Sequence, residues 1–80
     1  MQDLIFERLK SRLGPLLRGA SPDKITSDAC LVDDLGADSM FMVEASVAIE
    51  DEFGLSEIKD AEMAAFRTIG DMVQFIKARV

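Results

Sequence analysis

The sequence predicts an all-α fold, a small four-helix bundle with three longer helices, one short third helix and a long loop between the first two helices. Apolar residues recur at the three- and four-residue spacing of amphipathic helices, and no segment alternates as a half-buried strand would. Turn and capping residues separate these segments. The chain has 80 residues, 49% of them hydrophobic, so we expect residues 1–80 to form a single domain around one core.

The first helix is expected from about Gln2 to Leu13, because one face carries the apolar residues Ile5, Phe6, Leu9 and Leu13. Gly14-Pro15 should end or kink it, since proline has no N–H group and crowds the preceding turn. Leu16 and Leu17 are too apolar to remain in solvent. A short helical continuation is therefore expected after Pro15.

A long loop should begin at Gly19, with a brief helical turn at Ser21-Pro22-Asp23. Five of its apolar residues could pin it to the core: Ile25, Cys30, Leu31, Val32 and Leu35. We interpret Cys30 as a small buried apolar residue rather than a nucleophile. A loop of this length in so small a domain usually has a function.

The second helix is expected from about Ser39 to Phe53, with Asp38 as its N-terminal cap and Gly54 as its end. On a helical wheel of about 100° per residue, one arc should face the core and comprises Met42, Ala45, Ile49 and Phe53. A second apolar arc, roughly opposite, contains Met40, Val43 and Val47. Carboxylates fringe the second arc, namely Glu44, Glu50 and Asp51. This arc is either a protein-docking surface or ordinary packing covered by the loop or the third helix.

Two further helices complete the predicted bundle. Asp60 can cap a short third helix that continues to about Ala65. The segment Thr68-Ile69-Gly70-Asp71 resembles a capping box, with Asp in place of the usual Glu or Gln, and should start the last helix. The apolar stripe of that helix comprises Ile69, Met72, Val73, Ile76 and Val80.

Composition excludes several classes of chemistry. The chain has no His, Trp or Tyr and only one Cys, so it can form no Ser-His-Asp triad, Cys-His pair, ordinary His/Cys zinc site or internal disulfide. The segment Asp33-Asp34-Leu35-Gly36 lacks the alternating carboxylates of a calcium loop. We therefore expect neither catalytic residues nor a metal site.

Negative charge is concentrated in the middle of the chain. The net charge is −6, made up of −10 in residues 28–62 and +2 in each flanking segment. Such a block should repel nucleic acids and anionic membranes and attract basic protein surfaces, although acidic surfaces also simply keep proteins soluble. No stretch approaches the ~20 apolar residues of a membrane span, and the first residues do not resemble a signal peptide. We expect a cytoplasmic location.

Ser39 stands at the start of the second helix, where free N–H groups and the positive end of the helix dipole would favour a phosphate bonded to its hydroxyl. The alternative is that Ser39 merely caps the helix, as serine commonly does.

The stretch from Asp33 to Met40, followed by Val43-Glu44 and by Glu50 to Gly54, resembles the acyl carrier protein family, aligned without gaps from about Thr26 to Gly54. In that family a separate transferase attaches 4′-phosphopantetheine from coenzyme A to the matching serine. The resemblance implies that Ser39 is the attachment point, that Gly36 and Asp38 belong to the cofactor site, and that the protein is a carrier rather than an enzyme. The thiol of the arm would hold acyl groups as thioesters.

The resemblance also makes the second helix a recognition helix on a monomeric protein. Its partners would be the transferase and acyl-processing enzymes with basic docking patches. The implied contact residues are Met40, Phe41, Glu44, Val47, Glu50 and Asp51. Long acyl chains fold between the helices in some members of the family, and Met42, Ala45 and Ser46 could permit this here, but ordinary packing explains these residues equally well.

Phe41 departs from the family, because fatty-acid carriers often have an acidic residue at this position. On the helical wheel it lies to the side of the predicted core arc, so it could be an exposed contact for a dedicated partner or could tuck under the loop. The carrier would then serve either fatty-acid biosynthesis or a specialised lipid or polyketide pathway. The alternative function is an unmodified, acidic, carrier-like interaction module.

Overall fold

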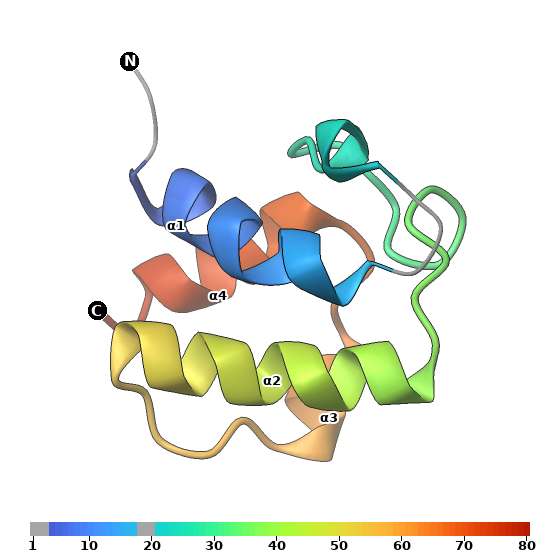
Figure 1. The fold of residues 1–80 in the computed structure, drawn as a ribbon. Coiled ribbons are helices and arrows are strands. Elements are labelled where there is room, and N and C mark those ends of the chain that lie inside the picture. Colours follow the sequence, from blue (N-terminus) through green and yellow to red (C-terminus); the bar gives the residue numbers. More distant parts are fainter. Residues whose placement is uncertain (1–3, 18–20) are drawn as a thin grey trace.

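The computed structural model describes residues 4–17 and 21–80, and within them it contains four α-helices and two short 3₁₀ helices (Figure 1). In chain order these are α1 (Leu4–Leu13), η1 (Gly14–Leu16), η2 (Pro22–Lys24), α2 (Ser39–Phe53), α3 (Asp60–Ala64) and α4 (Ile69–Lys77). The described residues form no strand, only an isolated bridge between Cys30 and Thr68. The predicted all-α bundle is therefore confirmed.

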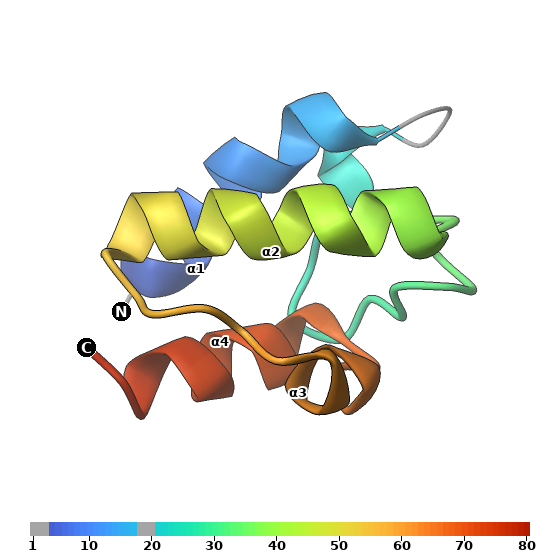
Figure 2. The ribbon, with the colours of Figure 1, turned by 90° about the horizontal axis from the view of Figure 1, so that it is seen from below.

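The two ends of α2 lie beside different parts of the chain. The loop before α2 crosses one end of the bundle, while the first described turn of α1 and the last turn of α4 lie at the opposite end (Figures 1 and 2). η1 and η2 confirm the two predicted short helical turns around residues 15 and 22. The predicted start of the first helix at Gln2 and the start of the loop at Gly19 lie outside the described residues.

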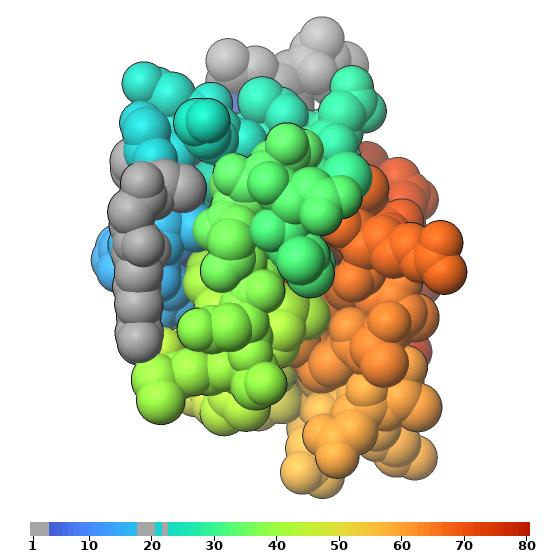
Figure 3. Space-filling model, turned by 90° about the vertical axis from the view of Figure 1, so that its right-hand side faces the viewer, coloured from blue at the N-terminus to red at the C-terminus, as the bar shows by residue number. Residues whose placement is uncertain are grey.

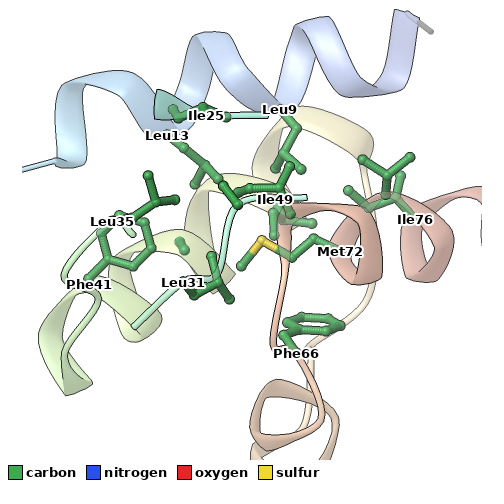
Figure 4. Close-up of a cluster of buried hydrophobic side chains, with 14 of the residues drawn as sticks. Leu9, Leu13, Ile25, Leu31, Leu35, Phe41, Ile49, Phe66, Met72 and Ile76 are labelled. Carbon is green, nitrogen blue, oxygen red and sulfur yellow. The ribbon is translucent and has the colours of Figure 1, made fainter. Parts of the chain in front are cut away.

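The core draws apolar side chains from α1, the long loop, α2 and α4 (Figure 4). The largest fully buried side chains are Leu9, Leu13, Ile25, Leu31, Ile49, Ile69, Met72 and Ile76. No polar or charged residue is buried among those described. The predicted stripe of the last helix is confirmed except at Val80, which is exposed because α4 ends at Lys77. No helix in the described part of the chain is long and apolar enough to cross a membrane.

The long loop is pinned to the core by Ile25, Leu31 and Leu35, as predicted. Val32, by contrast, is 69% exposed, and Cys30 is half-buried. The cause is a helix-like turn in which the N–H groups of Asp34 and Leu35 both donate to the Cys30 carbonyl oxygen. Residues four apart, Leu31 and Leu35, then point inward, and the intervening Val32 points to solvent. The expectations that Val32 and Cys30 would be buried anchors are wrong.

The helix ends follow local capping chemistry. α2 stops at Gly54, whose φ of +64° is the left-handed conformation that glycine adopts most readily. At the start of α4 the Thr68 hydroxyl accepts from the Asp71 N–H at 3.2 Å, and Asp71 Oδ2 accepts from the Thr68 N–H at 3.1 Å, which confirms the predicted capping box. The prediction that Asp60 caps α3 is wrong: Lys59 is the cap, Asp60 is the first helical residue, and the Lys59 N–H donates to Glu62 Oε1 at 2.9 Å.

Candidate functional site

Ser39 is the first residue of α2, and its side chain is exposed. Figure 3 views the molecule from the side where this helix begins, and the loop and first turn of α2 fill the centre of that face. Within the described residues, no group hydrogen-bonds to the Ser39 hydroxyl. The side chain is therefore open to solvent and is not used to stabilise the helix end.

Asp38 caps α2 in place of Ser39. Its backbone is extended, and its Oδ1 accepts a hydrogen bond from the Phe41 N–H at 2.8 Å. This bond satisfies one of the N–H groups that have no partner within the helix. The predicted cap is thus confirmed, and the interpretation of Ser39 as a cap is wrong.

Gly36 turns the chain from the loop into α2. Its φ is +67°, and its N–H donates to the Val32 carbonyl oxygen at 3.2 Å, while the Ala37 N–H donates to the Leu31 carbonyl oxygen at 2.8 Å. A Cβ atom on Gly36 would meet nothing within 4 Å. The glycine is therefore required by the backbone conformation rather than by close packing.

The buried face of α2 is rotated from the predicted one. It consists of Phe41, Ala45, Ala48 and Ile49. Ala45 and Ile49 were predicted to be buried, but Met42 and Phe53 are only half-buried. The rotation brings Phe41 and Ala48 inward.

Phe41 is a core residue, and the expectation that it is an exposed partner contact is wrong. Its side chain is only 5% exposed and belongs to the same buried cluster as Leu31 and Leu35. The alternative that it tucks under the loop is correct. Burial of an aromatic ring removes a large apolar area from water, which is a strong reason for α2 to turn this residue inward.

The second apolar arc of α2 is exposed, as the docking interpretation requires. Met40, Val43 and Val47 are 57%, 63% and 58% exposed, so neither α3 nor the described part of the loop covers them. We call these three residues the α2 ridge. Val43, which the helical wheel places in this arc, is exposed with the other two, although the contact residues implied by the family resemblance did not include it.

The acidic residues beside the α2 ridge differ in their contacts. Glu44 is half-buried. Glu50 Oε2 accepts from the Ile58 N–H at 2.8 Å, so this side chain fixes the connection between α2 and α3. Asp51 Oδ2 accepts from Arg12 Nη1 of α1 at 3.2 Å, yet its side chain stays 72% exposed. Glu50 and Asp51 therefore have structural contacts in addition to the partner contacts expected of them.

The start of α2 fits a phosphate-linked group on Ser39. The hydroxyl is exposed, and Asp38 already satisfies the Phe41 N–H, so a group added at Ser39 would displace no hydrogen bond seen among the described residues. The positive end of the helix dipole favours a phosphate there. Asp33, Asp34 and Asp38 nearby are exposed, and their charges remain accessible to a basic partner.

A comparison with protein families agrees with this geometry. The model of one family, described as the phosphopantetheine attachment site, matches residues 7–76. Carrier domains of this family bear covalently attached 4′-phosphopantetheine, are generally non-catalytic, and interact with phosphopantetheinyl transferases and acyl-processing enzymes. Because the match covers α2, α3, the loop before α2 and most of α1 and α4, the chain belongs to the phosphopantetheine attachment site family and has the carrier domain of acyl carrier proteins.

Proposed function

We propose that Ser39 is the residue that carries the 4′-phosphopantetheine arm and that the protein delivers acyl groups to a succession of enzymes. The arm supplies a terminal thiol that holds the acyl group as a thioester. The observation that supports attachment at Ser39 is that its side chain is exposed at the start of α2. Asp38 caps the helix, so the Ser39 hydroxyl is not needed for that role. Helix α2 presents the hydroxyl on a rigid element beside the α2 ridge, where a docked enzyme can reach both.

Ser39 cannot activate itself. The chain contains no histidine, and the carboxylate next to it, Asp38, accepts the Phe41 N–H. A serine hydroxyl needs an adjacent base to become a good nucleophile. The transferase must therefore supply the base as well as coenzyme A.

The test of the attachment site is the intact mass of the protein after incubation with coenzyme A and a broad phosphopantetheinyl transferase. We expect the mass of one arm to be added to the unaltered protein and to a Ser56→Ala variant, and none to be added to Ser39→Ala. Ser56 is the matched control because it is another exposed serine, in the connection between α2 and α3. No addition to the unaltered protein, or equal addition to Ser39→Ala, would favour the unmodified interaction module.

The α2 ridge, together with the acidic residue Glu44, is proposed as the docking face for enzymes with basic patches. Exposed apolar side chains with a charged rim are typical of protein interfaces, and charge complementarity speeds association. Val47→Ser should weaken binding to such an enzyme, whereas Val80→Ser, at a valine that is also largely exposed but lies outside α2, should not. Glu44→Lys should weaken binding and reduce its dependence on salt, and unchanged affinity at all salt concentrations would contradict the proposed face.

The acyl group that the protein carries would identify the pathway that it serves. The buried Phe41 removes an acidic contact that fatty-acid carriers often present, which favours a specialised lipid or polyketide pathway over general fatty-acid biosynthesis. The intact mass of the protein purified from its native host reports the arm and its acyl group together. A long unbranched acyl series would contradict the specialised pathway.

A further inference from the structure

Phe41 occupies the first inward-facing position of α2. The two helical residues before it, Ser39 and Met40, are exposed, while Phe41 is 5% exposed. Its backbone is held in place by the bond from its N–H to Asp38 Oδ1. In Figure 4 Phe41 and Leu35 mark one end of the buried cluster, and Ile76 marks the other. A chain that entered the core from Ser39 along this face of α2 would meet the Phe41 ring first.

The core around Phe41 is closed by other buried side chains. Leu31 and Leu35 cover it from the loop, with exposed fractions of 1% and 4%, and Ala45 follows it on the same face of α2 with 0%. Four of the surface cavities in the described part of the chain have volumes of 290 to 540 Å³, and none of these four is lined by a residue of α2. The largest of these four lies along α1, around Lys10 and Pro15. None of these four cavities offers a chain attached at Ser39 a route into the core.

An acyl chain could enter along this face only by displacing the ring. Each methylene transferred from water into an apolar interior gains roughly a factor of four in the equilibrium constant. Displacing a buried Phe ring into water forfeits the burial of many more carbon atoms than a short chain supplies. A short chain therefore stays outside, and Phe41 sets the length of chain at which entry could become favourable.

We propose that Phe41 determines cargo specificity: its ring closes the core below Ser39, so that acyl groups remain outside the bundle and the protein carries short acyl groups. This inference rests on the proposed attachment at Ser39. An exposed short chain would be immediately accessible to a docked enzyme. A long chain left in water would instead add exposed apolar surface beside the α2 ridge.

The test attaches alkyl chains at position 39 without the arm or a transferase. A Ser39→Cys, Cys30→Ser protein is converted to mixed disulfides with methyl and n-octyl methanethiosulfonate, and the melting temperature of each adduct is measured. With Phe41 present, we expect the methyl and octyl adducts to melt at the same temperature. In the same protein with Phe41→Ala, the octyl adduct should melt about 4 °C or more above the methyl adduct, because the chain can fill the vacated space.

Three further variants make the result specific. Phe66→Ala removes another buried ring, from the connection between α3 and α4, and should give no difference between the octyl and methyl adducts. Met42→Ala, at the half-buried neighbour of Phe41, should also give none. Phe41→Leu keeps an apolar side chain and replaces Phe41→Ala if the latter fails to fold; it should show a smaller gain of the same sign.

The proposal is overturned if the octyl adduct is already stabilised with Phe41 present, if neither Phe41 variant gains stability from the octyl chain, or if Met42→Ala or Phe66→Ala gains as much. Because thiol modification requires no coenzyme A, this outcome is independent of whether the transferase modifies Ser39. Failure of the mass test would overturn the attachment site, whereas failure of the alkyl test would overturn only the role of Phe41.

Discussion

Arg8 of α1 binds Glu52 of α2 at two points. Its Nε donates to Glu52 Oε2 at 2.7 Å, and its Nη2 donates to the Glu52 backbone carbonyl oxygen, also at 2.7 Å. The same guanidinium lies 4.6 Å from the centroid of the Phe53 ring. These contacts tie α1 to the last turn of α2, at the end of the helix away from Ser39.

Arg12, one turn further along α1, extends this network. Its Nη1 donates to Glu52 Oε1 at 3.1 Å and to Asp51 Oδ2 at 3.2 Å. The hydrogen bonds from Arg8 and then Arg12 lower the pKa of Glu52, and those to Glu52 and then Asp51 raise the pKa of Arg12. A network of several charges contributes more to stability than an isolated surface pair.

The first prediction concerns this network. Glu52→Gln should lower the melting temperature by a few degrees, because it removes the charge that both arginines share. Glu57→Gln is the control, since Glu57 is an exposed glutamate in the connection between α2 and α3. The difference between the two variants should shrink in 1 M NaCl, where surface charges are screened. Equal melting temperatures at low salt would show that the network contributes nothing.

The second prediction concerns pH. The pKa values of three carboxyl groups are lowered: Glu52 by Arg8 and Arg12, Glu62 by the Lys59 N–H and Arg79, and Asp71 by the N–H groups of Arg67 and Thr68. A group whose pKa is lowered in the folded state stabilises the fold above its unfolded pKa, here near 4.5 for Glu and 3.8 for Asp. That stability is lost as the pH falls through the lower, folded-state pKa.

Urea unfolding between pH 7 and pH 3 measures this effect. The difference in unfolding free energy between the unaltered protein and Glu52→Gln should be largest at neutral pH and should shrink as the pH falls below about 4.5. Because the two proteins differ by only one carboxylate, net charge affects the unfolding free energy of both almost equally, and this effect cancels in the difference. A difference that is constant or grows as the pH falls would contradict the assigned pKa direction.

The third prediction concerns the capping box of α4. Thr68→Ala should lower the free energy of unfolding by about 1 kcal/mol, because the Asp71 N–H loses its side-chain acceptor and keeps only the Thr68 carbonyl oxygen at 3.2 Å. Thr26→Ala, at an exposed threonine of the long loop, is the matched control and should change stability by much less. Equal losses in the two variants would show that the hydroxyl of Thr68 does not stabilise α4.

Local chemistry explains which features the sequence could predict. The limits of α2 follow from Asp38, which caps its start, and from Gly54, whose left-handed backbone ends it. The position of Ser39 at a helix start follows from the same residues. Each of these signals acts within a few residues, so no knowledge of the packing is needed.

Packing decided what the sequence left open. Phe41 lies beside the predicted core arc on the helical wheel, so periodicity alone favours Met42 as the more deeply buried residue. Packing against the loop that carries Leu35 buries Phe41 instead. The contacts of Glu50 with the Ile58 N–H and of Arg8 with Glu52 join residues 8 and 44 positions apart. Such pairs depend on how the helices are placed and have no signature in a local pattern.

The last prediction concerns α3, which contains no buried residue, although its half-buried Met63 packs against the core. Arg79 Nη2 donates to Glu62 Oε2 at 2.7 Å, while its guanidinium lies 3.5 Å from the centroid of the Phe75 ring. Two surface cavities of 390 and 480 Å³ share Glu62, Phe75 and Arg79 in their walls, so little other packing supports α3 on this side.

Arg79→Ala should therefore loosen α3 without unfolding the protein. We expect hydrogen exchange of the backbone amides in residues 58–66 to rise about two- to fivefold, while the amides of α1 keep their rates, because helices with few buried contacts open locally. Arg67→Ala is the control, since it removes an exposed arginine from the connection between α3 and α4. A uniform rise across all helices would mean that Arg79 stabilises the whole fold, and no rise would mean that its contact with Glu62 does not hold α3.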